Sequence, residues 1–284
     1  MTPRFSCPLC RVELIGETNI NCPRCGFALH REDGIWRDDS VATPTGFDTA
    51  AREHLHGIEE KHFWFAPRDR LLREIAQREL PAGGAALELG CGSGRLLRAW
   101  DAQFSSCTAL ELHAQSLFEA GGRGSNAMLV QADVGRLPLA DDQFDALMAF
   151  DVLEHADPVA MLGEARRVAR RGARLLLSVP AYQSLWSYAD ELAGHRCRYD
   201  RALLARELRA SGWRMRGHTH YQFALFPLLW LSRRLLGARA RRAEREPAAF
   251  VAAILGRINA MEVRLFSRWR LPFGSSLIVW AEAA

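Results

Sequence analysis

Residues 87–95 read Leu87-Glu88-Leu89-Gly90-Cys91-Gly92-Ser93-Gly94-Arg95 and continue a short apolar run that begins at Ala85. Glycines in alternate positions let the backbone turn sharply and keep any Cβ away from a ligand that lies against the main chain. The third glycine of the dinucleotide fingerprint would fall at position 95, which is Arg95. The pattern is Glu-x-Gly-x-Gly-x-Gly, and it predicts a ligand-binding turn between a first strand and a helix.

Downstream of this turn, short apolar runs alternate with longer helical patterns such as Pro158–Ala169 and Arg201–Ser211, the second closed by Gly212. Such alternation is typical of βαβ units and a parallel sheet. The predicted strands are Ala85–Leu89, Cys107–Leu112, Met128–Ala132, Ala146–Phe150, Arg174–Val179, Trp213–His220 and Ser276–Ala283. The expected fold class is α/β, with a seven-stranded, doubly wound, Rossmann-like sheet.

Acidic residues follow three of these strands. Glu111 ends the second strand, where a carboxylate can accept the ribose hydroxyl protons of a nucleoside. Asp133 follows the third strand and Asp151 the fourth. Each acid alone could be a helix N-cap. As an ordered set at the carboxyl ends of neighbouring strands, where open α/β sheets bind ligands, the acids favour a nucleoside site.

The glycine-rich turn and these acids resemble class I S-adenosylmethionine (SAM)-dependent methyltransferases. The resemblance implies SAM as cofactor, with Glu111 on the ribose and Asp133 near the adenine amino group. It also implies that the segment from Phe150 to His155 lines the methyl-transfer face. The residues predicted to bind the cofactor are Trp64, Arg68, Glu88, Gly90, Gly92, Gly94, Glu111, Leu112, Asp133, Val134, Phe150 and Asp151.

Upstream, residues 62–68 read His-Phe-Trp-Phe-Ala-Pro-Arg within a charged helical stretch, Thr49–Leu80. This segment looks like the entry helix of several small-molecule methyltransferases. There the aromatic side chains cover the cofactor and the arginine meets the methionine carboxylate, which a guanidinium suits by bidentate geometry. The alternative is an amphipathic core helix with a solvated Arg68.

Two Cys-x-x-Cys pairs open the chain: Cys7 with Cys10, and Cys22 with Cys25. Four thiolates from two tight turns suit a structural, tetrahedral Zn²⁺, because a catalytic zinc keeps one position open. We expect a zinc ribbon and linker over residues 1–46 and the catalytic domain over residues 47–284.

The ribbon also resembles that of bacterial rRNA guanine-N1 methyltransferases, so nucleic acid stays open as a partner. Residues 1–46 contain five arginines against six acidic residues, whereas a ribbon that grips RNA should be basic. A structural or partner-docking ribbon is therefore favoured over an RNA-binding one.

Two histidines are candidates for catalysis on the acceptor side. His155 follows the fourth strand, and His195 lies in a Gly-His-x-x-Arg-Tyr segment after the fifth strand. That segment resembles one found in many small-molecule methyltransferases. Histidine is the usual proton acceptor near neutral pH. Alternatively, His195 caps the helix that begins near Asp200, and transfer proceeds by proximity alone.

Strands six and seven are separated by a long insert, Tyr221–Ser275, where a short hairpin loop is usual. It combines an apolar helix with an arginine-rich patch, Arg233–Arg245. The insert is predicted to cover a lipophilic acceptor, to touch a membrane surface through residues 221–245, or to pack on the enzyme or on a second copy in a homodimer.

The whole chain carries a net charge of +4 and does not itself require nucleic acid as a partner. No secretory signal pattern opens it, and its most apolar segment, Tyr221–Leu231, is shorter than the roughly 20 residues that span a bilayer. We expect a cytoplasmic methyltransferase that acts on a small, lipophilic acceptor, at oxygen. The alternatives are an rRNA methyltransferase and a non-catalytic SAM-binding regulatory or interaction protein.

Overall fold

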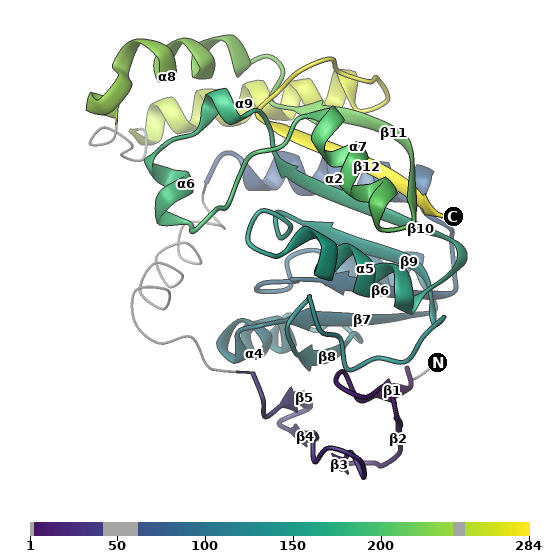
Figure 1. The fold of residues 1–284 in the computed structure, drawn as a ribbon. Coiled ribbons are helices and arrows are strands. Elements are labelled where there is room, and N and C mark those ends of the chain that lie inside the picture. The colour runs from purple at the N-terminus through teal and green to yellow at the C-terminus, as the bar shows by residue number, and fades with distance from the viewer. Residues whose placement is uncertain (1–2, 42–61, 241–247) are drawn as a thin grey trace.

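The central sheet contains the seven predicted strands. The computed structural model describes residues 3–41, 62–240 and 248–284. The seven strands are β6 (Ala85–Leu89), β7 (Ser106–Glu111), β8 (Met128–Gln131), β9 (Phe144–Phe150), β10 (Ala169–Pro180), β11 (Trp213–Tyr221) and β12 (Ser276–Ala283). They are hydrogen-bonded in the order β11-β12-β10-β9-β6-β7-β8. The doubly wound α/β fold is therefore confirmed (Figure 1).

The strand directions show which edge of the sheet is suited to ligand binding, namely the edge at the carboxyl ends of the parallel strands. Strands β6 to β10 are parallel, whereas β12 is antiparallel to both β10 and β11. The chain runs from β6 through β7 to β8 and then crosses to β9 on the other side of β6. Such a reversal of strand order opens a crevice outside the carboxyl ends of the strands. The glycine-rich turn after β6 lies at this crevice.

Helices cover both faces of the sheet. Alternate residues of β10 point to opposite faces: Leu175 and Leu177 pack in one core cluster, and Leu176 packs in the other. Helices α5 and α7 bury their apolar side chains in the first cluster, and α2, α3 and α4 in the second. The helices are α2 (Phe65–Glu79), α3 (Leu97–Gln103), α4 (Ala114–Gly122), α5 (Pro158–Val168), α6 (Tyr188–Leu192), α7 (Arg201–Ala210), α8 (Phe226–Ala240) and α9 (Ala249–Phe266), with a short 3₁₀ turn at Gln183–Leu185.

The N-terminal ribbon extends the sheet, which the sequence did not indicate. Its strands are β1 (Phe5–Ser6), β2 (Glu13–Leu14), β3 (Asn19–Asn21), β4 (Ala28–Glu32) and β5 (Ile35–Asp38). Strand β5 pairs in parallel with β8, so that β5, β4 and β3 bring the main sheet to ten strands. The ribbon therefore covers an edge of the main sheet that would otherwise expose unpaired backbone groups.

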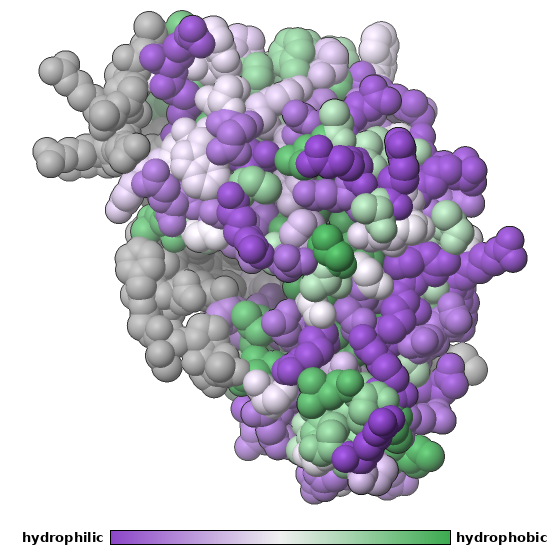
Figure 2. Space-filling model, in the orientation of Figure 1, coloured by the Kyte–Doolittle hydropathy of each residue, from purple (hydrophilic) through white to green (hydrophobic). Residues whose placement is uncertain are grey.

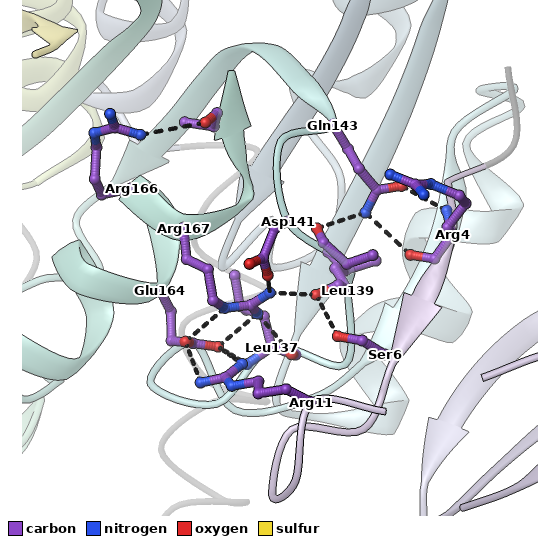
Figure 3. Close-up of polar contacts among 12 residues, drawn as sticks. Arg4, Ser6, Arg11, Leu137, Leu139, Asp141, Gln143, Glu164, Arg166 and Arg167 are labelled. Atoms are coloured by element: carbon purple, nitrogen blue, oxygen red, sulfur yellow. Dashed lines mark hydrogen bonds and ion pairs between the residues drawn. The ribbon is translucent and has the colours of Figure 1, made fainter. Parts of the chain in front are cut away.

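A network of hydrogen bonds and ion pairs links the ribbon to helix α5 and to the loop before β9 (Figure 3). The Arg11 guanidinium donates to both carboxylate oxygens of Glu164 on α5, at 2.7 and 3.2 Å. Arg167 donates to the same carboxylate and to Asp141. Burial acts to raise the pKa of Glu164, but these hydrogen bonds from Arg167 and Arg11 outweigh it and lower that pKa. Glu164 thus remains ionised and ties the two parts of the chain together.

The long insert between β11 and β12 contains two helices that differ in burial. Helix α9 packs against α2, and its Val263 is 1% exposed within the core. Among its described side chains, residues 226–234, helix α8 has no fully buried one, and Leu228 and Leu231 are exposed. Figure 1 shows both helices beside α6. No helix among the described residues is long and apolar enough to span a membrane.

Several predicted segments fall outside the described residues. These are the boundary between residues 46 and 47, the part of the helical stretch Thr49–Leu80 that precedes residue 62, and residues 241–245 of the arginine-rich patch. Within the described part, the predicted helices agree with α5 and α7 to within one residue at their ends. Gly212 adopts the left-handed conformation, with φ of 79°, that its predicted role as C-cap of α7 requires.

Candidate cofactor and acceptor site

The glycine-rich turn after β6 needs its glycines for close packing. Gly90 has φ of 68°, and a Cβ there would lie 2.4 Å from a methyl carbon of Val152. Gly94 has φ of 76°, and a Cβ there would lie 2.7 Å from the Cβ of Ala120 on α4. At Gly92 nothing lies within 4 Å of that position. Gly90 and Gly92 line the main cavity. Gly94 does not line it and instead packs against Ala120 of α4.

Glu111 and Asp133 lie at the carboxyl ends of β7 and β8, as predicted. The Glu111 carboxylate accepts hydrogen bonds from the backbone N–H groups of Gly92 and His113, both at 3.1 Å. Asp133 accepts from the backbone N–H of Gly135 at 2.7 Å. Both acids line the main cavity, together with Leu112 and Val134. Glu111 therefore has two roles: it orients the glycine-rich turn through Gly92, and it lines the cavity next to that turn.

Glu88 is a buried carboxyl at the floor of the same cavity. The indole Nε1–H of Trp100 donates to its Oε2 at 2.7 Å. Burial raises the pKa of Glu88 to about 8, although the hydrogen bond from Trp100 acts in the opposite direction. Glu88 is 4% exposed and is therefore a group that holds a proton near neutral pH.

Arg68 is buried at the start of α2 and engages protein acids. Its Nη2 donates to Asp151 and, at 3.0 Å, to Ser178. Its Nη1 lies 3.7 Å from Asp69, and its guanidinium lies 4.7 Å from the ring centre of Trp64. Asp151 has φ of 55°, an uncommon conformation that the surrounding contacts hold in place. Arg68, Trp64, Phe150 and Asp151 all line the main cavity.

On the other side of the cavity, His195 and His155 face one another with ring centres 4.8 Å apart. The Nδ1 of His195 lies 2.8 Å from Oδ1 of Asp190, and the Nε–H of Arg198 donates to the same oxygen. Burial acts to raise the pKa of Asp190, but the hydrogen bonds from His195 and Arg198 hold it well below its usual range. The cap of α7 is the side chain of Asp200, not His195. The alternative role for His195 is therefore wrong.

Glu154 lies beside these two histidines and is 1% exposed. Neither of its carboxylate oxygens has a hydrogen-bond partner among the described residues. Burial, together with the nearby charge of Asp151, raises the pKa of Glu154 well above its usual range. Neither Glu154 nor Asp190 was predicted from the sequence as a site residue. The signals that could have found them were the pair Glu154-His155 directly after β9 and the spacing of Asp190 five residues before His195.

One cavity of about 1600 Å³ is lined by the groups at both ends of the site, namely Arg68, Glu88, Glu111, Asp133, Asp151, Glu154, His155 and His195. Figure 2 shows the surface hollowed at the side where Figure 1 places α6 above α4. The volume exceeds the roughly 300–1,000 Å³ of an ordinary ligand pocket and leaves room for two ligands. Its far end is lined by side chains of the insert, namely Leu225, Leu228, Leu229, Ser232, Arg233 and Leu255.

The four cysteines of the ribbon come together. The Sγ atoms of Cys7 and Cys25 are 3.4 Å apart, and those of Cys10 and Cys22 are 3.3 Å apart. Thiolates at about 2.3 Å from a tetrahedral Zn²⁺ lie about 3.8 Å from one another, and a disulfide would bring two sulfurs to about 2.05 Å. The spacing is compatible with a bound metal ion.

Comparison with known proteins identifies the central part of the chain. Residues 87–177 match a family model described as a methyltransferase domain. The malonyl-[acyl-carrier protein] O-methyltransferase of Enterobacter lignolyticus is 33% identical over 160 residues, which is 54% of this chain and 61% of that protein. The chain covers less than two thirds of the length of this and the other first-ranked curated relatives.

Solved structures share the fold. A chain in the complex that contains the Haloferax volcanii Trm112 methyltransferase activator aligns with a TM-score of 0.58 at 17% identity, over 85% of this chain and 99% of that one. Geranyl diphosphate C-methyltransferase from Streptomyces coelicolor aligns with a TM-score of 0.52 at 12% identity, over 76% of this chain and 75% of that one. At these identities the alignments support the architecture alone.

Proposed function

We propose that the protein transfers the methyl group of SAM to an oxygen of a small acceptor with an apolar body, because residues 87–177 match a family model described as a methyltransferase domain. The observation that carries this proposal is the single cavity that runs from the glycine-rich turn to the leucines of the insert. A polar, acid-lined end suits a nucleoside, and a leucine-lined end suits an apolar acceptor.

The cofactor would lie at the polar end. We assign its ribose to Glu111, its adenine to the neighbourhood of Asp133 and Val134, and its methionine part to the space between the glycine-rich turn and Trp64. Arg68 is already paired with Asp151, so it would act chiefly by holding that acid and the Trp64 ring in place. SAM supplies a methyl group that is bound to a positively charged sulfur. After the transfer, the rest of the cofactor leaves as a neutral thioether, S-adenosylhomocysteine.

His195 is the proposed proton acceptor for an acceptor hydroxyl. The ionised Asp190 holds its Nδ1, so the Nε2 is the nitrogen left to take a proton, and the imidazolium that forms is stabilised by the same carboxylate. The ring of His155 packs edge-on against the ring of His195 and would limit the directions from which the acceptor hydroxyl can approach His195. The leucine side chains of the insert would exclude water from the acceptor.

We also propose that the four ribbon cysteines hold a structural Zn²⁺. Replacing Cys22 with serine should remove the zinc, about one ion per chain, and unfold β3 to β5 while leaving β6 to β12 folded. The reason is that folding of a small ribbon depends on its metal, whereas Ile35 is the single ribbon residue among the buried residues of the second core cluster of the main sheet. Metal analysis together with amide hydrogen exchange checks this. Cys197→Ser, outside the cluster, is the control, and full zinc content in Cys22→Ser would contradict the assignment.

The cofactor assignment is tested by replacing Glu111 with alanine. The variant should bind SAM roughly 10- to 100-fold more weakly, because it loses charge-assisted hydrogen bonds to the ligand and the bond that orients Gly92. Isothermal titration calorimetry measures the affinity, and Glu17→Ala, an exposed glutamate in the ribbon, is the matched control.

Three outcomes would overturn the proposed function in different ways. Tight NAD binding without SAM binding would exclude the methyltransferase assignment. SAM binding with no conversion to S-adenosylhomocysteine in any cell extract would favour a non-catalytic SAM-binding protein. Transfer of labelled methyl groups into rRNA, rather than into the small-molecule fraction, would replace the acceptor class.

A further inference from the structure

Three potential metal ligands meet in the acceptor half of the cavity. Glu154 and His155 follow β9, and His195 follows α6, about forty residues later in the chain. One ligand atom from each of the three side chains lies within 4.8 Å of the other two. All three side chains line the main cavity. The cluster shares no residue with the group of four ribbon cysteines.

The burial of Glu154 is the strongest indication that the cluster binds a cation. Its carboxylate is almost fully buried, and neither oxygen receives a hydrogen bond from any described residue. A buried carboxylate without partners is costly, so native proteins keep one where a proton or a cation completes it. Asp151, the nearest other acid that follows β9, is already held by Arg68 and Ser178. Glu154 is therefore the acid that remains to meet a cation.

His195 is oriented in the way that metal-binding histidines usually are. Its Nδ1 is bound to Asp190, so its Nε2 is the atom left to coordinate. Asp190 is fixed in turn by Arg198 and by the backbone N–H of Ser187, both at 2.8 Å. A carboxylate behind the imidazole fixes the ring and makes its free nitrogen a better donor to a metal.

We propose that Glu154, His155 and His195 bind a divalent transition-metal ion whose open positions face the acceptor. Two imidazoles and one carboxylate suit Zn²⁺, Fe²⁺ or Mn²⁺ better than Mg²⁺ or Ca²⁺, which prefer oxygen ligands. Ligands about 2.0–2.1 Å from a tetrahedral ion are roughly 3.4 Å apart, so ligand atoms that now lie within 4.8 Å of one another approach by up to about 1.4 Å when the ion binds. His155 is exposed and can make that movement.

The role of the ion rests on the proposed function. An acceptor hydroxyl on the metal loses its proton more easily, and a second acceptor oxygen can take another open position. The hydroxyl proton passes to solvent, the O–CH₃ bond forms as the S–CH₃ bond breaks, and S-adenosylhomocysteine leaves as the neutral thioether. His195 then acts as a ligand rather than as the proton acceptor. The inferred acceptor class is a molecule with two neighbouring oxygens beside an apolar body.

The test is a Zn²⁺ titration of full-length protein that already holds one zinc per chain. Calorimetry should find one further ion bound by the wild type. Glu154→Gln and His195→Ala should weaken that binding by at least about 100-fold, and Asp190→Asn by about 10- to 100-fold. His218→Ala, a half-buried histidine of β11 outside the cavity, is the matched control and should bind as the wild type does.

A SAM titration of the same samples separates this inference from the proposed function. Wild type and Glu154→Gln should bind SAM equally, because Glu154 is assigned to the acceptor side. If SAM binds but no further zinc does, or if Glu154→Gln takes up zinc as tightly as the wild type, the metal site is wrong and the proposed function stands. If the second zinc binds and SAM does not, the metal site stands and the proposed function fails.

Discussion

Replacing Arg68 with methionine should lower the free energy of unfolding by about 3–5 kcal/mol, the usual cost of removing one partner of a buried ion pair. The Arg68 side chain is 7% exposed and is the cation that faces both Asp151 and Asp69. Without it, Asp151 loses its charged partner, and among the described residues Asp69 keeps the ion pair with Arg95. SAM binding should also fall below detection, because the Trp64 ring and Asp151 both line the cavity.

Arg70 provides the matched control for this variant. It lies two residues further along α2, is exposed, and pairs with Glu74 one helical turn away. Arg70→Met should change the free energy of unfolding by no more than about 0.5 kcal/mol, as exposed i,i+4 pairs contribute little. Urea denaturation of both variants checks the contrast, and the double variant Arg68→Met with Asp151→Asn should recover part of the loss. Equal midpoints for Arg68→Met and Arg70→Met would refute the argument.

The second large effect concerns the leucines of the insert that line the cavity. Replacing Leu225 and Leu229 together with serine should reduce kcat/KM for the acceptor by about 100-fold or more, because both are half-buried and a leucine that a bound acceptor buries fully contributes up to roughly 1.5–3 kcal/mol of apolar contact. SAM affinity should stay unchanged, since both leucines lie away from the glycine-rich turn. The assay measures labelled methyl transfer from SAM into the solvent-extractable fraction of a cell extract.

Leu231→Ser is the control for the leucine pair, because Leu231 is exposed on α8, the helix that carries Leu229, and does not line the cavity. Deleting the whole insert is a poorer test. Val263 of α9 packs in the core against α2, so its removal would expose the core and destabilise the enzyme for reasons unrelated to the acceptor. Full activity of the Leu225 and Leu229 double variant would show that the insert is not part of the acceptor site.

The strands of the main sheet could be predicted because their signals are local. A strand buried on both faces is a short apolar run bounded by polar turns, and β6 and β12 start and end at the predicted residues. The glycine-rich turn and the acids after β7 and β8 were visible for the same reason. Each lies within a few residues of the strand end that positions it.

The features that were missed depend on distant parts of the chain. Nothing near Ile35 indicates that β5 will pair with β8, because that pairing brings together residues about ninety positions apart. The role of Arg68 was assigned to a ligand, whereas its position beside Asp151 and Ser178 only becomes clear in the folded chain. Glu154 was likewise read as part of a motif, and its burial without a partner could not be seen in the sequence.

The pairing of β5 with β8 also bears on how the protein is made. The ribbon leaves the ribosome first, and at about 5–20 residues per second its partner strand follows on the order of ten seconds later. If the ribbon cysteines hold the Zn²⁺ proposed above, that ion keeps the ribbon folded during this interval, before β8 is available to pair with β5. In a cell short of zinc, newly made chains would complete the main sheet with β8 uncovered. Such chains are open to edge-to-edge aggregation, so zinc supply would limit how much protein accumulates before any effect on catalysis appears.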